Sequence, residues 1–237
     1  REAAQRADIV FSCVGNDYDL NAVALGADGA FAGMKKNAIY VDHSTVSANV
    51  ARKLEEQARG AGFGFLDAPV SGGQAGAEKG ILTVMVGGDA QAFAVAQPVM
   101  AHYGRAVTLM GHAGSGQLTK MVNQITISGM VQSLAEGLNF ATRAGLDAKK
   151  VIDVIAKGAA QSWQLENRGP TMVDDRFDFG FAVDWMRKDL QICLDESRRN
   201  GALMPVTALV EQWYGRLQEK GYGRLDSSCL MKLLTEK

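Results

Sequence analysis

A lysine and two side-chain amides stand close together in residues 111–124, whose sequence is GHAGSGQLTKMVNQ. A glycine-rich turn opens this stretch and leads into a long apolar run, which predicts a helix. Lys120 lies about one turn into that helix, and Asn123 and Gln124 follow at i+3 and i+4, so the three side chains share a face. One interpretation is that Lys120 reaches the surface while the amides bond to nearby backbone groups. The other is a catalytic ammonium or amine held by amides, and the spacing alone leaves both open.

Polar turns follow three of the apolar segments that are predicted to be strands. Strands are expected at residues 8–14, 37–42, 63–67, 81–86 and 106–110, with helical segments between them. This alternation indicates βαβ units and a mainly parallel sheet, and the nearly continuous apolar strands indicate that both sheet faces are covered. The polar turns at residues 14–16, 43–45 and 71–73 lie at carboxyl ends of strands, where open α/β sheets bind ligands. Each turn alone is an ordinary strand–helix connection, but their common position favours a shared function.

The strands stop near residue 113, and the rest of the chain is predicted to be helical. Residues 117–145 are apolar on almost every side, which predicts a long helix that is buried over most of its surface. Further helices are expected at residues 151–157, 163–167, 185–199, 205–220 and 226–234. We therefore expect an α/β domain over residues 1–113 and an all-helical domain over residues 114–237. Two modest domains leave little interior to cover the long helix, so we also expect a homodimer or homotetramer.

Composition and charge exclude several classes of function. The chain has 237 residues and a formal net charge of −1, which argues against a nucleic-acid-binding surface. No apolar run reaches the roughly 20 residues of a membrane-spanning helix, and no signal peptide is recognised. The three cysteines form no CxxC pair, and the three histidines show no metal-ligand spacing. We therefore expect a cytoplasmic protein with no metal site, no nucleic-acid partner and no membrane partner.

Four short stretches resemble one enzyme family. They are VDHSTVS at residues 41–47, DAPVSGGQAGAEKG at residues 67–80, GSGQLTKMVNQ at residues 114–124 and KDL at residues 188–190. In these stretches the chain is similar to the β-hydroxyacid dehydrogenases, which include 3-hydroxyisobutyrate dehydrogenase and tartronate semialdehyde reductase. The resemblance implies the C-terminal part of a Rossmann-type, mainly parallel sheet, followed by an all-helical domain with a long interdomain helix. It also implies hydride transfer between a small 3-hydroxy acid and NAD or NADP, which gives the semialdehyde.

The resemblance assigns proton transfer to Lys120, which would act as the general acid/base. Lysine suits this role because desolvation readily lowers the pKa of an ammonium group. Asn123 or Gln124 would assist it. Family members differ in which of these two positions carries the important amide, and we favour Asn123 as the one that touches the substrate together with Lys120.

The same resemblance assigns the substrate carboxylate and the cofactor to other residues. A hydroxyl group and backbone N–H groups can hold an anion, and the residues that match this part of the family site are Ser71, Gly72 and Gly73. The residues that match contacts near the nicotinamide ribose are Val14, Gly15 and Thr45. Lys188 matches a residue of the helical domain that closes over the cofactor, and a solvated helix charge is the alternative interpretation.

The beginning of the chain departs from the family pattern. Family members begin with a strand, a GxGxxG turn and a helix, which bind the pyrophosphate of the cofactor, and no such stretch precedes the strand at residue 8. We therefore expect that roughly 60 residues of the nucleotide-binding half are absent. We also expect this chain alone to bind NAD(P) weakly or not at all.

Two other functions remain open beside the dehydrogenase. One is a non-catalytic protein derived from the family, whose helical half serves binding and oligomerisation. The presence of Lys120 and Ser71 argues against it. The other is a more distant dehydrogenase of the 6-phosphogluconate type, but no cluster of basic residues for a phosphate group accompanies residues 71–73.

Overall fold

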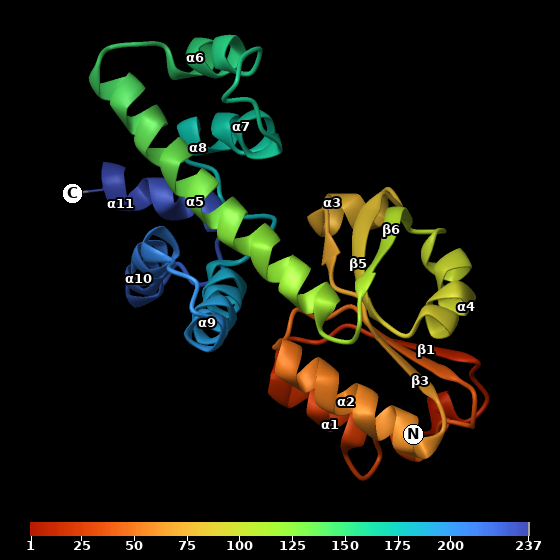
Figure 1. The fold of residues 1–237 in the computed structure, drawn as a ribbon. Coiled ribbons are helices and arrows are strands. Elements are labelled where there is room, and N and C mark those ends of the chain that lie inside the picture. Colours follow the sequence, from red (N-terminus) through yellow and green to blue (C-terminus); the bar gives the residue numbers. More distant parts are fainter. Residues whose placement is uncertain (237) are drawn as a thin grey trace. The chain divides into compact units, whose positions relative to one another are not determined.

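The computed structural model describes residues 1–236, and the chain divides into two compact units. The first unit comprises Arg1–Asn123 and the second comprises Gln124–Lys237. The sheet lies in the first unit, and the second is built from helices (Figure 1). Helix α5 (Ser115–Arg143) begins in the first unit and continues into the second. Residue 113, the last residue of the predicted α/β domain, lies in the turn between the last strand and α5.

The first unit contains a six-stranded sheet. Its strands are β1 (Ile9–Ser12), β2 (Ile39–Asp42), β3 (Gly64–Asp67), β4 (Val70–Ser71), β5 (Leu82–Gly88) and β6 (Gly104–Gly111). The pairs β1–β2, β2–β3 and β5–β6 are parallel, whereas β5 runs antiparallel to β3 and β4. The predicted α/β class with a mainly parallel, Rossmann-type sheet is therefore confirmed.

Strand β5 reverses direction because the connection before it is short. Between β4 and β5 the chain holds only the short helix α3 (Gly73–Glu78) and its flanking turns. A parallel crossover usually needs about a dozen residues or more, including a helix that packs on the sheet. The chain therefore returns antiparallel, with Leu66 opposite Gly88 and Val70 opposite Val84. The apolar pattern of the strand does not indicate this reversal.

Helices cover both faces of the sheet (Figure 1). In the first unit they are α1 (Asp17–Leu25), α2 (Ala48–Ala61) and α4 (Ala90–Met100), with short 3-10 turns at η1 (Glu2–Ala4) and η2 (Ala30–Ala32). On one face Tyr40 and Phe65 belong to the same buried cluster as Leu54 of α2. On the other face Leu66 is buried with Met100 of α4. Since successive strand residues point to opposite faces, a continuous apolar strand supplies both cores.

Polar caps fix where the first helices begin. Asn16 Oδ1 accepts a hydrogen bond from the backbone N–H of Asp19 at 2.9 Å, and Ser47 Oγ accepts one from Val50 at 3.2 Å. A cap of this kind stabilises a helix by about 1 kcal/mol. Asn16 is therefore the N-cap of α1, and Ser47 is the N-cap of α2.

The second unit packs its helices around one apolar core. After α5 these are α6 (Ala148–Ile155), α7 (Trp163–Asn167), α8 (Gly169–Val173), α9 (Val183–Asn200), α10 (Pro205–Glu219), η3 (Ser227–Met231) and α11 (Lys232–Thr235). Leu138 of α5, Leu190 of α9 and Tyr214 of α10 are buried in this core. The predicted all-helical second part is confirmed over the residues that the structure describes.

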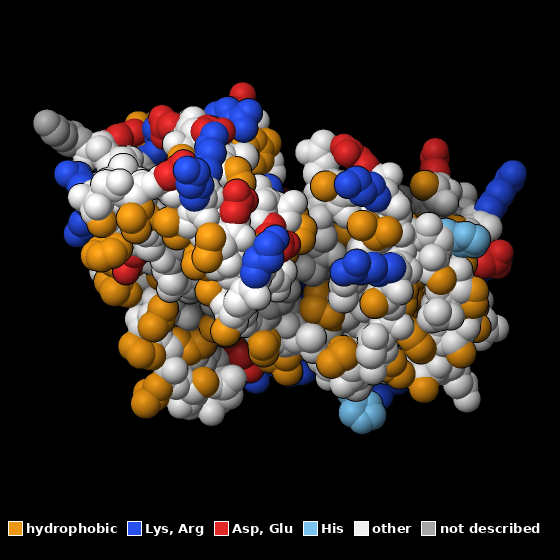
Figure 2. Space-filling model, turned by 90° about the horizontal axis from the view of Figure 1, so that it is seen from above, with side chains coloured by type: hydrophobic (Ala, Val, Ile, Leu, Met, Phe, Trp, Pro, Cys, Tyr) orange, Lys and Arg blue, Asp and Glu red, His pale blue; other side chains and the backbone are white. Residues whose placement is uncertain are grey.

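Helix α5 is less buried than its composition predicts. Residues Val131, Ala135 and Leu138 form a buried stripe along it, but Phe140 is 72% exposed and Val122 is 62% exposed. The expectation of a helix buried on most sides is therefore wrong for a single chain, because the core of the second unit contacts only one stripe of α5. In Figure 2 apolar side chains, drawn in orange, are visible on the surface of the helical unit.

Candidate active site

Asp67, the last residue of β3, fixes the start of the helix that carries Lys120. Its carboxylate accepts hydrogen bonds from the backbone N–H of Gly114 at 2.7 Å and of Gln117 at 2.9 Å. The first N–H groups of a helix have no partners within the helix, and the helix dipole favours an anion there. Asp67 is fully buried, and burial raises its pKa to about 6 although the backbone hydrogen bonds act in the opposite direction. Strand β3 therefore sets the position of α5.

The glycine at residue 116 allows this close approach. A Cβ atom on Gly116 would lie 2.4 Å from the carbonyl oxygen of Met85 and 2.8 Å from Oδ2 of Asp67, both far inside van der Waals contact. A Cβ atom on Gly87 would lie 2.6 Å from Oδ1 of Asp67. The glycine-rich turn that precedes Lys120 therefore serves the packing of a helix start against strand ends.

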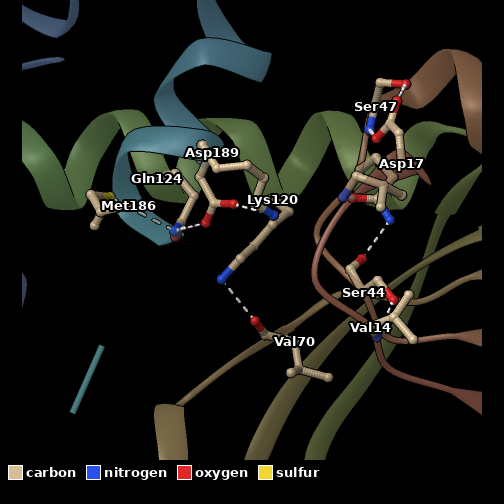
Figure 3. Close-up of polar contacts among 12 residues, drawn as sticks. Val14, Asp17, Ser44, Ser47, Val70, Lys120, Gln124, Met186 and Asp189 are labelled. Carbon is tan, nitrogen blue, oxygen red and sulfur yellow. Dashed lines mark hydrogen bonds and ion pairs between the residues drawn. The ribbon is translucent and has the colours of Figure 1, made fainter. Parts of the chain in front are cut away.

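Lys120 extends from α5 to Val70, the first residue of β4. Its side chain is only 8% exposed, and Nζ donates a hydrogen bond to the carbonyl oxygen of Val70 at 2.8 Å (Figure 3). Val70 immediately precedes Ser71, the first of the predicted carboxylate-binding residues. The interpretation of Lys120 as a lysine that reaches the surface is therefore wrong, and the structure instead holds its ammonium group beside a strand-end turn.

The turn at residues 71–73 has a conformation that glycine favours. The φ angle of Gly72 is 129° and that of Gly73 is 61°, which side chains with a Cβ atom rarely adopt. A Cβ atom on Gly73 would meet nothing within 4 Å, so the space beside this residue is open. Ser71 Oγ donates a hydrogen bond to Asn123 Oδ1 at 3.2 Å. The structure thus brings Lys120, Asn123 and this turn together.

Asp42, the last residue of β2, joins the turns after β1 and β2. Its Oδ1 accepts hydrogen bonds from Ser12 Oγ at 2.8 Å and from Ser44 Oγ at 2.6 Å. Ser44 Oγ accepts in turn from the backbone N–H of Val14 at 2.8 Å (Figure 3). Burial raises the pKa of Asp42. The predicted cofactor residues Val14 and Thr45 therefore lie in two turns that are hydrogen-bonded to each other, and Thr45 is partly exposed.

A second contact joins the same two turns. Asp17 is the first residue of α1. Its Oδ1 accepts a hydrogen bond from the backbone N–H of Ser47 at 2.8 Å, and its Oδ2 accepts one from Ser47 Oγ at 2.5 Å (Figure 3). The start of α1, which follows Gly15, is thereby tied to the start of α2.

His43 holds the turn after β2 against the chain that leaves β3. Its Nδ1 lies 2.6 Å from the carbonyl oxygen of Ala68, and its Nε2 lies 2.8 Å from the hydroxyl oxygen of Tyr103. The ring stacks on Phe11 with a centroid distance of 5.7 Å. Burial lowers the pKa of His43. Sequence reasoning assigns no role to His43, although its place directly after a strand in VDHSTVS is the signal that marks it.

The remaining predicted residues, Gln124 and Lys188, lie in the second unit and share one partner. Gln124 Nε2 donates to Asp189 Oδ2 at 2.6 Å, and Lys188 Nζ forms an ion pair with Asp189 Oδ1 at 2.7 Å (Figure 3 shows the contact of Gln124). Asp189 is 2% exposed. Sequence reasoning misses this aspartate, although it is the middle residue of the KDL stretch.

Two family models match the chain almost from end to end. The model described as the NAD-binding domain of 6-phosphogluconate dehydrogenase matches residues 1–111. The model described as the NAD-binding domain of NADP-dependent 3-hydroxyisobutyrate dehydrogenase matches residues 114–234. The chain belongs to the β-hydroxyacid dehydrogenase family.

Individual relatives agree with this assignment. An uncharacterized oxidoreductase of Shewanella frigidimarina is 58% identical over 99% of this chain and 80% of the relative. The 2-hydroxy-3-oxopropionate reductase of Escherichia coli is 32% identical over 99% of this chain and 80% of the relative. The crystal structure of 3-hydroxyisobutyrate dehydrogenase from Salmonella typhimurium superposes with a TM-score of 0.90 at 29% identity, covering 98% of this chain and 81% of that one. The protein is thus an NAD(P)-dependent β-hydroxyacid dehydrogenase, and the non-catalytic alternative is not supported.

The NAD-binding model matches residues 1–111, and the chain spans about 80% of the length of the relatives named above. The strand ends fit a nucleotide cofactor. Parallel strands β1, β2 and β3 place their carboxyl ends at one sheet edge, and a partly exposed threonine, Thr45, stands there.

The described residues provide neither a metal-ligand cluster nor a membrane-spanning helix. Among residues 1–236, no group of three or more His, Cys, Asp or Glu side chains is placed to hold a metal ion. Within the same part of the chain, no helix combines the length and the apolar character needed to cross a membrane.

Proposed function

We propose that this dehydrogenase interconverts a small 3-hydroxy acid and its semialdehyde, with Lys120 as the general acid/base. The observation that carries the proposal is the burial of Lys120 with Nζ 2.8 Å from the Val70 carbonyl oxygen, directly beside the glycine turn at residues 71–73. A nearly buried lysine on an otherwise apolar stretch of helix needs a local partner. The Val70 carbonyl supplies that partner and holds the amine at the turn.

The proton transfer follows from this position. When bound, NAD(P) supplies the hydride acceptor for oxidation and the hydride donor for reduction. In oxidation the neutral amine of Lys120 takes the proton of the substrate hydroxyl group, so that the carbonyl forms without a free alkoxide. In reduction the ammonium form returns the proton to the carbonyl oxygen. The Val70 carbonyl oxygen accepts a hydrogen bond from Nζ in either protonation state of Lys120, and so keeps the orientation of the amine constant.

The carboxylate of the substrate is assigned to Ser71, Gly72 and Gly73. The positive φ angles at both glycines curve the backbone, and the open space beside Gly73 admits a small anionic group. Ser71 contributes a hydroxyl group at the edge of this turn. A carboxylate held here leaves the hydroxyl group, two carbon atoms away in a 3-hydroxy acid, within reach of Lys120.

Asn123 is the amide that we assign to the substrate, in preference to Gln124. Asn123 contacts Ser71 and is therefore part of the first unit's turn network. Gln124 is 3% exposed, and its Nε2 donates to Asp189 in the second unit. An amide that already bonds to a buried carboxylate serves the structure of its own unit.

The cofactor is assigned to the turns that hold Val14, Gly15 and Thr45. These turns lie at the carboxyl ends of adjacent parallel strands and are held by Asp42. Lys188 is assigned to the cofactor by family resemblance, and in this structure its ammonium group pairs with Asp189.

A homodimer or homotetramer completes the proposal. The second unit exposes several large apolar side chains, among them Phe140, Leu203 and Val206, which are 72%, 94% and 61% exposed. Light scattering at several protein concentrations tests this assignment, and a monomer at every concentration would contradict it.

The proposed substrate class is tested by a matched panel with NAD⁺ and with NADP⁺. The substrates are 3-hydroxyisobutyrate, glycerate and serine, and tartronate semialdehyde is used in the reverse direction. The methyl ester of 3-hydroxyisobutyrate is the control, because it keeps the hydroxyl group and lacks the anion. We expect at least one free acid to exceed the ester in kcat/KM by roughly tenfold or more, since loss of a charged contact costs over a kcal/mol. Equal rates for acid and ester, or no turnover of any 3-hydroxy acid, would overturn the proposal.

A further inference from the structure

Gln117 is a buried amide whose side chain bonds to a turn far away in the chain. It lies in the first turn of α5 and is 1% exposed. Its Oε1 accepts from the backbone N–H of Val46 at 3.1 Å, and its Nε2 donates to the carbonyl oxygen of Ser44 at 2.8 Å. Both partners belong to the turn after β2, 71 and 73 positions away in the chain. One side chain therefore holds a turn by both a donor and an acceptor.

Gln117 joins the turn that holds Thr45, which is assigned to the cofactor, to the helix that holds Lys120, which is assigned to proton transfer. Thr45 lies between the two backbone groups that the amide contacts. Lys120 follows Gln117 by three residues, so the two side chains lie on the same face of α5 about one turn apart. The backbone N–H of Gln117 is in turn held by the carboxylate of Asp67. A rigid helix start therefore connects the turn that holds Thr45 to the amine of Lys120.

We propose that Gln117 is a positioning residue that fixes the turn at residues 44–46 relative to Lys120 and so sets the alignment of cofactor and proton donor. The proposal rests on the function proposed above for Thr45 and Lys120. Both polar atoms of the Gln117 side chain bond to backbone groups of this turn, so Gln117 acts through the turn. Small misplacements of reacting groups are costly, since about 1 Å can reduce a rate by roughly a hundredfold.

A purely structural role is the competing explanation, because any buried amide must have its hydrogen bonds satisfied. The two explanations differ in kinetics. A structural amide affects stability and leaves the turnover of the folded enzyme unchanged. A positioning amide lowers kcat and raises the KM for NAD(P) in a protein that remains folded, and it leaves the pH dependence that belongs to Lys120 in place.

The variant Gln117→Met tests the proposal, because methionine keeps the length of the side chain and makes neither hydrogen bond. The matched control is Gln132→Met, on the same helix. Gln132 is also buried, at 6% exposure, but its Nε2 bonds to Glu136 four residues away. Both variants remove a buried amide from α5, and only one of them touches the turn at residues 44–46.

We expect Gln117→Met to lower kcat by about tenfold or more and to raise the KM for NAD(P), while Gln132→Met leaves both within about twofold. Hydrogen exchange at the amide of Val46 should become faster in Gln117→Met alone. If kcat and the cofactor KM of folded Gln117→Met stay within about twofold of the parent enzyme, the proposal is overturned. An equal loss of activity in the two variants would overturn it as well.

The exchange rate at Val46 separates this proposal from the proposed function, because it reports the contact without any turnover. Fast exchange at Val46 together with a lower kcat supports the positioning role even if Lys120 later proves not to transfer the proton. Should Gln117→Met fail to fold, Gln117→Glu decides instead, since it keeps the acceptor for Val46 and loses the donor to Ser44. A folded Gln117→Glu enzyme with unchanged kcat and unchanged cofactor KM would refute the proposal, and a lower kcat would support it.

Discussion

Replacing Lys120 by methionine removes the amine and keeps an unbranched apolar side chain in a nearly buried position. Removal of a positioned general acid or base typically lowers the rate by about 10²–10⁴-fold. At about 1.36 kcal/mol for each tenfold step, this loss corresponds to about 3–5 kcal/mol of transition-state stabilisation. We therefore expect kcat of Lys120→Met to fall by at least about a hundredfold.

The stability of the same variant should change far less. The hydrogen bond from Nζ to the Val70 carbonyl is lost, and a bond from a charged donor contributes about 1.5–3 kcal/mol. Methionine also avoids the desolvation of a buried ammonium group, which costs several kcal/mol. Since the two effects oppose each other, we expect the free energy of unfolding to change by less than about 2 kcal/mol. Loss of activity without loss of fold is the signature of a catalytic lysine.

The assay follows reduced nicotinamide during oxidation of the best acid from the panel, between about pH 6 and about pH 10. Lys120→Arg keeps the positive charge but cannot release a proton in this range, so it should be as inactive as the methionine variant. The matched control is Thr119→Val, since the hydroxyl group of Thr119 bonds to the Ser115 carbonyl at 2.8 Å within α5 itself. Thr119→Val should keep its activity. Turnover of Lys120→Met within about threefold of the parent enzyme at every pH, or a fully active Lys120→Arg, would refute the acid/base role.

Three other predictions follow from the strand-end turns. Gly73→Ala should lower the free energy of unfolding by about 1 kcal/mol, because the φ angle of Gly73 is 61°, and it should raise the KM of the acid substrate. The control is Gly60→Ala, because Gly60 lies inside α2 and a Cβ atom there would meet nothing within 4 Å. Gly60→Ala should raise the free energy of unfolding by about 0.5–1 kcal/mol and leave that KM unchanged. Equal KM values in both variants would remove the carboxylate from this turn. The folded state raises the pKa of Asp67 from 3.8 to about 6, so the folded chain binds this proton more tightly than the unfolded chain does. The contribution of Asp67 to the free energy of unfolding should therefore fall by about 3 kcal/mol as the pH rises from about 3 to about 7. Urea titrations of Asp67→Asn across this range should lack that decrease, and an unchanged pH slope would contradict the assignment. Burial lowers the pKa of His43 below 6.5, so the pH dependence of its contribution to the free energy of unfolding is opposite to that of Asp67. The contribution of His43 is complete above pH 6.5 and is lost as the pH falls through the lowered pKa. In His43→Phe this loss on acidification should disappear, and a pH dependence identical to that of the parent chain would show that His43 is not its source.

The helices and their ends were predictable because the interactions that define them are local. Ser47 and Asp147 accept hydrogen bonds from backbone groups two or three residues ahead, so the spacing of residues in the chain already contains the contact. Gly201 ends α9 in the left-handed conformation that glycine favours. The apolar strands were likewise visible, because a parallel sheet buried on both faces needs continuous apolar residues.

The direction of β5 and the exposure of α5 were not predictable in the same way. Apolar character states that a strand is buried, but it does not state whether the neighbouring strand runs parallel or antiparallel. The length of the connection through α3 decides this. For α5, composition shows which residues are apolar, and the packing of other helices decides which of them are covered, so Phe140 remains exposed in the single chain.

The sequence by itself determined the elements of this dehydrogenase, its family and the stretch that holds Lys120, Asn123 and Gln124. Only the tertiary structure showed that Asn123 contacts the turn at residues 71–73 while Gln124 contacts Asp189. It alone revealed the anchors of the site, Asp67 and Gln117, whose partners lie 47 to 73 positions away. The spacing of residues in the sequence predicts helix caps and helix faces, because the residues that interact there are only a few positions apart. The carboxylate of Asp67 contacts the start of α5 only when the sheet has formed. A local pattern in the sequence therefore does not identify this contact.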